Sequence, residues 1–230
     1  MPFNFQLLVE FFFSGLITLV SILLLFGIID PEKTKELTDT FKLASSGQLV
    51  FIVFIGGLVS YYLGTVVNAL SNKIIREFFS GYRIKMIRRK LGIQKSEKGE
   101  VQNLNNIEKE KLSLIEELLP GFATKNEKDK LKELYTAARN YCGIHSEETS
   151  RMISYHWGLL RLSRATILPL ILLCIILLIC LFVPGNTTEE LFALVVVIVA
   201  LILTIISYSY REKFLIYTVF DIFFISQKNQ

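Results

Sequence analysis

The chain has little of what small secreted domains and metal-binding domains depend on. Its 230 residues include three cysteines and two histidines. Three cysteines are too few for a disulfide framework, and Cys174 and Cys180 lie inside an apolar stretch. Cys142 and His145 have the spacing of metal ligands, but no third and fourth ligand is evident. A glycine-rich phosphate loop, a dinucleotide fingerprint and a nucleophile elbow are also missing. We therefore expect no metal and no cofactor.

Charge is missing from four long windows. Hydrophobic residues make up 52% of the chain, charged residues 20%, and the mean hydropathy is +0.47. The windows 48–70, 165–183 and 191–207 contain no charged residue, and the window 5–29 contains only Glu10. As a helix, each can cross a hydrocarbon core of about 30 Å. This pattern excludes a soluble globule and a disordered chain. It predicts an all-α membrane protein with four transmembrane helices.

The basic residues predict how these spans are threaded. Residues 71–164 contain 19 Lys or Arg and 12 Asp or Glu, a net charge of +7, whereas the whole chain carries +4. The loop 184–190 has no basic residue. Because basic loops stay in the cytoplasm, we expect a multi-pass protein of the inner (plasma) membrane with both termini cytoplasmic. The predicted organisation is a transmembrane hairpin over 1–70, a basic helical cytosolic domain over 71–164, a second hairpin over 165–210 and a cytosolic tail over 211–230.

Helical periodicity organises the predicted cytosolic domain. The first helix should break at Ser80-Gly81. Further helices are predicted near 104–119, over 126–143 with Gly143 at its end, and from a Ser146 cap without interruption into the third span. The buried stripe of the 126–143 helix is predicted to be Leu131, Leu134, Tyr135 and Ala138.

A basic patch follows the second span. Basic residues alternate there with apolar ones, which is typical of a helix that lies on anionic lipid. The same pattern also suits a surface for a nucleotide or nucleic acid, and the sequence leaves both open. The patch consists of Lys73, Arg76, Arg83, Lys85, Arg88, Arg89 and Lys90.

Small and polar residues form a stripe on each of the first two spans, at the spacing that lets helices pack closely. The stripes are Glu10, Ser14, Thr18 and Ser21 on the first span, and Gly56, Ser60, Gly64 and Asn68 on the second. We expect these two faces to form the main packing seam or to line a pore, with the apolar third and fourth spans facing lipid. Glu10 could reach the interface, meet Asn68 or Lys73, or join a ring of carboxylates at a pore mouth.

One short motif remains, Arg139 followed six residues later by His145, with Asn140 between them. It resembles the Arg-x4–6-His signature of HEPN ribonucleases, helical proteins that cleave RNA as dimers. The resemblance implies that His145 transfers a proton and Arg139 binds phosphate. The plainer interpretation places Arg139 in water and His145 at a helix end, and we expect neither to be catalytic.

The layout as a whole is similar to that of small multi-span membrane effectors of bacterial antiviral defence. That similarity implies a homo-oligomer in the bilayer that forms a pore or disrupts the membrane. A nucleotide, nucleic acid or partner protein at the cytosolic domain would control it. A membrane-tethered HEPN-like ribonuclease and a non-catalytic membrane scaffold are the alternatives.

Overall fold

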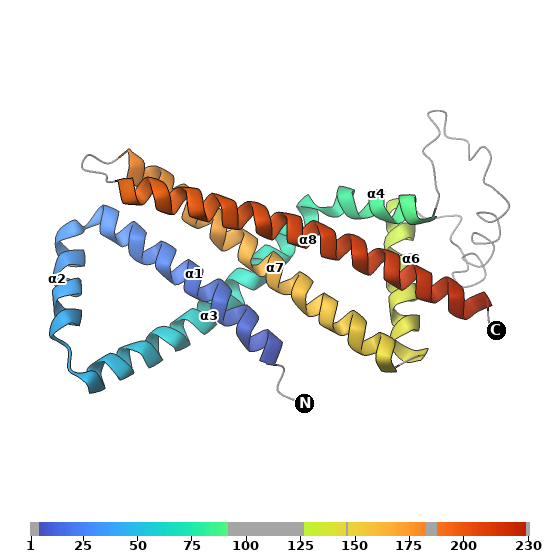
Figure 1. Ribbon diagram of the computed structural model, residues 1–230, viewed down its shortest axis with the longest axis horizontal. Coiled ribbons are helices and arrows are strands. Elements are labelled where there is room, and N and C mark those ends of the chain that lie inside the picture. Colours follow the sequence, from blue (N-terminus) through green and yellow to red (C-terminus); the bar gives the residue numbers. More distant parts are fainter. Residues whose placement is uncertain (1–4, 92–126, 146, 183–187, 229–230) are drawn as a thin grey trace. The chain divides into compact units, whose positions relative to one another are not determined.

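The computed structural model describes residues 5–91, 127–145, 147–182 and 188–228. Within these ranges the chain forms seven helices and no strand (Figure 1). Four helices are long and apolar enough to cross a membrane: α1 (Phe5–Ile29), α3 (Ser46–Phe78), α7 (Glu147–Leu181) and α8 (Thr188–Lys228). The prediction of an all-α protein with four membrane-spanning helices is confirmed, and the chain is a multi-pass membrane protein.

The chain divides into two compact units. Unit 1 comprises Met1–Glu77 and Leu160–Tyr208, and unit 2 comprises Phe78–Leu159 and Ser209–Gln230. Both α7 and α8 therefore begin in one unit and continue without a break into the other. The sequence predicts this continuity for α7. It sets residues 211–230 apart as a tail, whereas residues 211–228 belong to the second half of α8.

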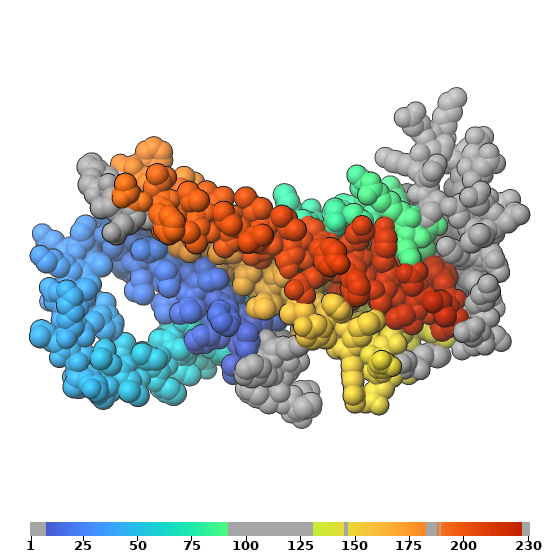
Figure 2. Space-filling view, in the orientation of Figure 1, coloured from blue at the N-terminus to red at the C-terminus, as the bar shows by residue number. Residues whose placement is uncertain are grey.

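Within unit 1, α1 and α3 cross, and the short helix α2 (Pro31–Leu43) joins the ends that have spread apart (Figure 1). The sequence predicts only a loop at 30–47. Asp30 starts this helix because its carboxylate accepts a hydrogen bond from the backbone N of Lys33 at 3.1 Å, and Pro31 occupies the first turn. A hollow of about 900 Å³ lies between α2 and the start of α3, and an opening is visible there in Figure 2.

The expectation that the third span faces lipid is wrong. Half of the most apolar stretch of α7 is buried, against 11% of that of α3 or α8. The buried residues of α7 in unit 1 include Ala165, Ile167, Leu170, Cys174 and Leu177. Hydrophobicity alone cannot separate a helix in lipid from a helix among other helices, because lipid tails are as apolar as leucine.

In unit 2, the second half of α8 packs with α4 (Ser80–Leu91), α6 (Glu127–His145) and the first part of α7. Its core face repeats every three or four residues and is almost fully buried: Leu215, Ile216, Val219, Phe220 and Phe223. Rings from α6 meet this face, with centroids 6.1 Å apart for Tyr135 and Phe220 and 5.4 Å apart for Tyr141 and Phe223. The hydrophobic core of unit 2 is therefore arranged around the end of the chain.

The predicted features of the 71–164 segment have different outcomes. The break near Ser80-Gly81 is confirmed, since α3 ends at Phe78 and α4 begins at Ser80. The predicted buried stripe of α6 is also confirmed, because all four residues are at most 8% exposed. The predicted end at Gly143 is wrong, since α6 continues to His145. The predicted helix near 104–119 and the Ser146 cap lie outside the described residues.

Candidate functional site

Glu10 is the most unusual side chain of unit 1. Its carboxylate is 1% exposed, in the first part of the apolar helix α1. Arg161 of α7 approaches it, with 3.8 Å between Nε and the Glu10 Oε2 atom, and Arg164, one turn further along α7, adds a second positive charge. The side chain of Asn68 on α3 lies beside the same carboxylate. We call these four residues, which come from three helices, the Glu10 cluster.

The Glu10 cluster is only partly satisfied. At 3.8 Å, the contact with Arg161 is an ion pair but not a hydrogen bond. Within the described residues, the Glu10 Oε1 atom and the Asn68 Oδ1 atom are buried without a hydrogen-bond partner. A buried network with open positions is costly in an apolar environment, and its partners can exchange.

The rest of the α1 stripe is buried but directed into its own helix. The Ser14 hydroxyl donates to the Glu10 carbonyl at 2.9 Å, Thr18 donates to the Ser14 carbonyl at 2.8 Å, and Ser21 donates to the Ile17 carbonyl at 2.8 Å. Each hydroxyl thus has a partner four residues back, as is common for serine and threonine in membrane helices. In this arrangement these side chains serve as small packing residues, whose hydroxyls need neither water nor an ion.

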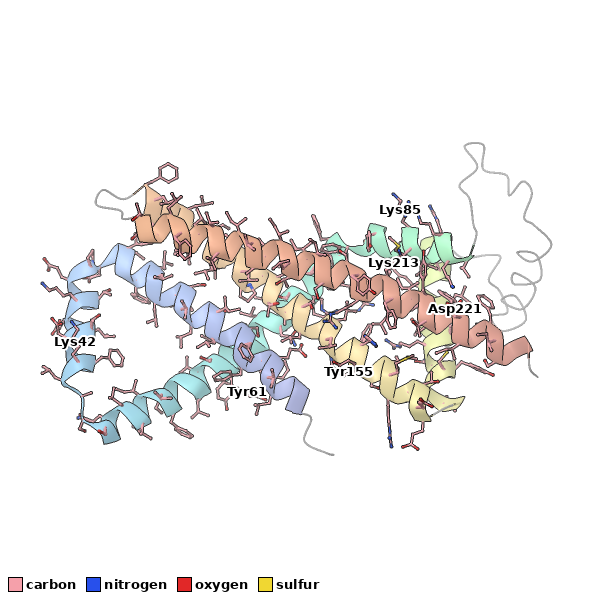
Figure 3. The ribbon with its side chains drawn as sticks, viewed as in Figure 1. Lys42, Tyr61, Lys85, Tyr155, Lys213 and Asp221 are labelled. Carbon is pink, nitrogen blue, oxygen red and sulfur yellow. The ribbon has the colours of Figure 1, made fainter. Side chains whose placement is uncertain are left out.

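The backbones of α1 and α3 touch where the two helices cross. A β-carbon at Gly64 would overlap the backbone carbonyl of Phe11, and one at Gly15 would overlap the carbonyl of Ser60 and lie 2.7 Å from the backbone N of Gly64. The Tyr61 ring (Figure 3) covers the crossing, edge-on to Phe11 at 5.7 Å. Only glycine fits at either position.

The α3 stripe divides into two parts. Ser60 and Gly64 are buried at the crossing, and Asn68 belongs to the Glu10 cluster. A β-carbon at Gly56 would meet no atom within 4 Å. Gly15 was not singled out from the sequence, although it follows Ser14 on the polar face of α1.

The predicted basic patch is also divided. Arg83 pairs with the buried Glu212 of α8, with 2.5 Å between the guanidinium and the carboxylate, and Lys90 pairs with Asp221 and lies 5.1 Å from the Tyr217 ring. Arg88 is half-buried. Four members remain exposed, namely Lys73, Arg76, Lys85 and Arg89, and Figure 3 shows Lys85 pointing outward from α4.

The ion pair of Arg83 and Glu212 lies near two buried titratable groups of α6. Burial raises the pKa of Tyr135 to about 12, against the opposing effect of nearby Arg83 and Arg139. Burial also raises the pKa of the Cys142 thiol, which donates a hydrogen bond to the Val219 carbonyl at 3.4 Å. Both groups stay neutral at physiological pH, so they act as core residues.

The structure places Arg139 on tryptophan. Its guanidinium lies 5.0 Å from the centroid of the Trp157 ring, and both residues line a groove between α6 and α7 together with Asn140. The side chain of His145 lies outside the described residues, so the expectation that neither Arg139 nor His145 is catalytic stays a prediction. Among the described residues, Cys142 is not part of any group of three or more possible metal ligands.

The comparisons with known proteins give no family for this chain: no protein-family model, no curated protein and no solved structure matches it.

Proposed function

We propose that this chain is a homo-oligomeric protein of the inner (plasma) membrane that permeabilises the bilayer in a regulated way. In this proposal the four spans form two hairpins and unit 2 is the cytosolic part that receives the controlling ligand or partner. The observation that carries the proposal is the Glu10 cluster, because ionisable residues inside a membrane segment are rare, costly and associated with ion pathways and proton relays.

The chemistry of the cluster explains how such control would work. With Glu10 engaged by Arg161 and Asn68, α1, α3 and α7 are held together in one state. A shift of α7 would move Arg161 and Arg164 together, since they lie one turn apart on the same helix. The carboxylate would then need water or a new partner, which favours a hydrated opening. This resting state differs from an open ring of carboxylates because arginines neutralise the charge.

Two further features support an assembly in lipid. The outer face of α3 exposes large apolar side chains that a membrane or a second copy would cover, among them Val50, Phe51, Val53 and Phe54. Gly56 lies on this helix with open space around it, which allows close approach of another helix. The layout is similar to that of membrane effectors of antiviral defence, and we include a role as such an effector in the proposal.

Flux through liposomes tests the proposal. Purified protein in vesicles that contain anionic lipid should release a trapped ion indicator when the control is relieved. E10Q and R161Q should both leak without any ligand, because each breaks the contact that holds the resting state. R151Q is the matched control, since Arg151 pairs with Glu147 on the exposed surface of α7. Wild-type and variant vesicles that all stay sealed would refute a permeabilising function.

Native mass measurement in detergent tests the oligomer separately. A species heavier than the 26.3 kDa monomer is expected, and a monomer at all concentrations would contradict the assembly.

Reporter fusions test the threading. Fusions after Lys95 and at the C-terminus should report inside, and a fusion within 30–47 should report outside. An outside signal after Lys95 would overturn the assignment of unit 2 to the cytoplasm.

A further inference from the structure

A groove in unit 2 has the composition of a binding site that the Glu10 cluster does not use. It lies between the end of α6 and the start of α7 and has a volume of about 500 Å³. This is within the usual range for small-molecule pockets. Its lining includes Arg139 and Asn140 from α6 and Ser150, Ile153, Ser154 and Trp157 from α7.

The Arg139 guanidinium has hydrogen-bond donors available for an anionic ligand. No carboxylate among the described residues lies within ion-pair distance of it, and its contact is the face of Trp157 at 5.0 Å. The described residues that line the groove include no acid. An arginine whose fork of donors stays open can bind a phosphate or carboxylate through two parallel hydrogen bonds. Asn140, Ser150 and Ser154 add neutral donors on the same lining.

The flat surfaces in the groove point to a ligand that also has a ring. The Trp157 indole and the Arg139 guanidinium are both flat groups and lie 5.0 Å apart, and Ile153 adds an apolar side chain to the lining. Nucleobases stack on both aromatic rings and arginine planes. We propose that this groove binds a small phosphorylated ligand with an aromatic base, of the nucleotide class.

The groove would supply the controlling ligand, and in that role it rests on the proposed function. Trp157, Arg161 and Arg164 follow one another on α7 at intervals of four and three residues, the spacing of one helical face. A ligand that contacts and displaces Trp157 thus acts on α7, the same helix that carries the two arginines of the Glu10 cluster.

The experiment uses the only tryptophan of the chain as its signal. Full-length protein in detergent is titrated with adenosine and guanosine monophosphates, adenosine, and inorganic phosphate, while Trp157 fluorescence is recorded and calorimetry provides a second readout. Both parts of a nucleotide are needed for a good fit. A monophosphate should therefore change the fluorescence saturably and bind at least about tenfold more tightly than adenosine or phosphate alone.

Variants make the result specific. R139Q should weaken nucleotide binding by about tenfold or more, the loss expected for a charge-assisted hydrogen bond. R151Q is the control, because Arg151 lies outside the groove and pairs with Glu147. Circular dichroism of R139Q checks that the helices persist, and S154A gives a milder change in the same groove.

Three outcomes would overturn the inference. If no probe gives a saturable signal, Arg139 and Trp157 form a stabilising contact only. If phosphate binds as well as the nucleotides, the groove is an anion site without base recognition. If R139Q binds nucleotides like the wild type, the site lies elsewhere. Binding without liposome flux would reject the proposed function and leave the groove standing, whereas flux without binding would do the reverse.

Discussion

Two arginines and one carboxylate meet in a place where a single charge is unfavourable. Arg164 is 5% exposed and Glu10 is 1% exposed, so neither is freely solvated by water. Glu10 is the only acid in the cluster, whereas the positive charge is shared by Arg161 and Arg164. The three charges are therefore not equivalent, and removing each one has a different consequence.

We predict that E10Q destabilises unit 1 more than R161Q. Loss of the carboxylate removes the buried acid that faces both Arg161 and Arg164. Breaking a buried ion pair by removing one partner costs about 3–5 kcal/mol. Loss of Arg161 leaves Glu10 with Arg164 and Asn68, so the expected loss is smaller. Thermal unfolding in detergent at equal protein concentration measures both. The test compares the loss of thermal stability in the two variants. A larger loss for R161Q than for E10Q would show that Glu10 does not hold the cluster together.

A second residue-scale prediction concerns Cys142. Its thiol is 1% exposed and bonded to the Val219 carbonyl, and burial raises its pKa, so little thiolate is present at pH 8. Native protein treated with iodoacetamide should leave Cys142 unmodified, while the same protein in strong denaturant should be fully alkylated. Peptide mass spectrometry reads each cysteine separately. Rapid native labelling of Cys142 would mean that α6 and the end of α8 separate in solution.

At the scale of elements, the crossing of α1 and α3 depends on backbone contact. Hydrophobic attraction does not hold helices together in lipid, so close packing must supply the stability. Gly15 and Gly64 provide it by bringing one backbone against the other. The arrangement brings Asn68, one turn beyond Gly64 on α3, to the Glu10 carboxylate on α1. Packing at the crossing and charge in the cluster are therefore coupled.

We predict that G64A and G15A each destabilise the protein and that G56A does not. The added methyl group overlaps a backbone at the first two positions, and forced overpacking costs about 1–3 kcal/mol. At Gly56 the space is open, and alanine favours a helix by about 1 kcal/mol over glycine. Thermal unfolding in detergent checks all three. Equal midpoints for G64A and G56A would show that the backbones are not in contact.

The sequence predicts the membrane-spanning helices well and the long-range contacts between them poorly. Bilayer thickness and backbone hydrogen bonding determine the lengths of α1, α3, α7 and α8, so apolar windows locate them. The small-residue spacing also marks Gly64 and Asn68. The sequence offers Asn68 as a partner of Glu10, but it does not reveal the arginines, because Arg161 lies 151 residues further along the chain and looks in sequence like a flanking positive charge.

The end of α8 was missed for a different reason. Residues 211–230 carry charges that break the apolar window, so a search for spans stops before them. The signal was present in the spacing of Leu215, Ile216, Val219, Phe220 and Phe223, which places apolar residues on one helical face. Amphipathic periodicity beyond the apolar window therefore marks the second half of α8.

At the scale of the whole molecule, unit 2 is assembled from segments far apart in the chain. Its core joins α4 and α6 to the last part of α8 through two ion pairs and the ring contacts of Tyr135 and Tyr141. The final helix must therefore be complete before this core can form.

We predict that ending the chain at Tyr210 unfolds unit 2 while the membrane helices persist. The truncation removes five nearly fully buried side chains, each worth about 1.5–3 kcal/mol, and leaves Leu131 and Leu134 without cover. Limited proteolysis should then cut α6 rapidly, and the apolar spans should stay protected in detergent. Replacing Asp221 with asparagine is the mild control, because that carboxylate is exposed. A truncated chain that resists protease like the full one would contradict the central role of α8.

The crossing of α1 and α3 at Gly15 and Gly64 also predicts which mutations a genetic screen will recover. Every missense change at codon 15 or codon 64 adds a β-carbon, so neither position has a conservative allele. The obstacle it meets is the main chain of Phe11 or Ser60, which no substitution can make smaller. A screen for second-site suppressors of G64A should therefore recover reversion to glycine but no compensating side chain in the facing helix. Mutants of the Glu10 cluster, whose contacts are all between side chains, should yield such suppressors readily.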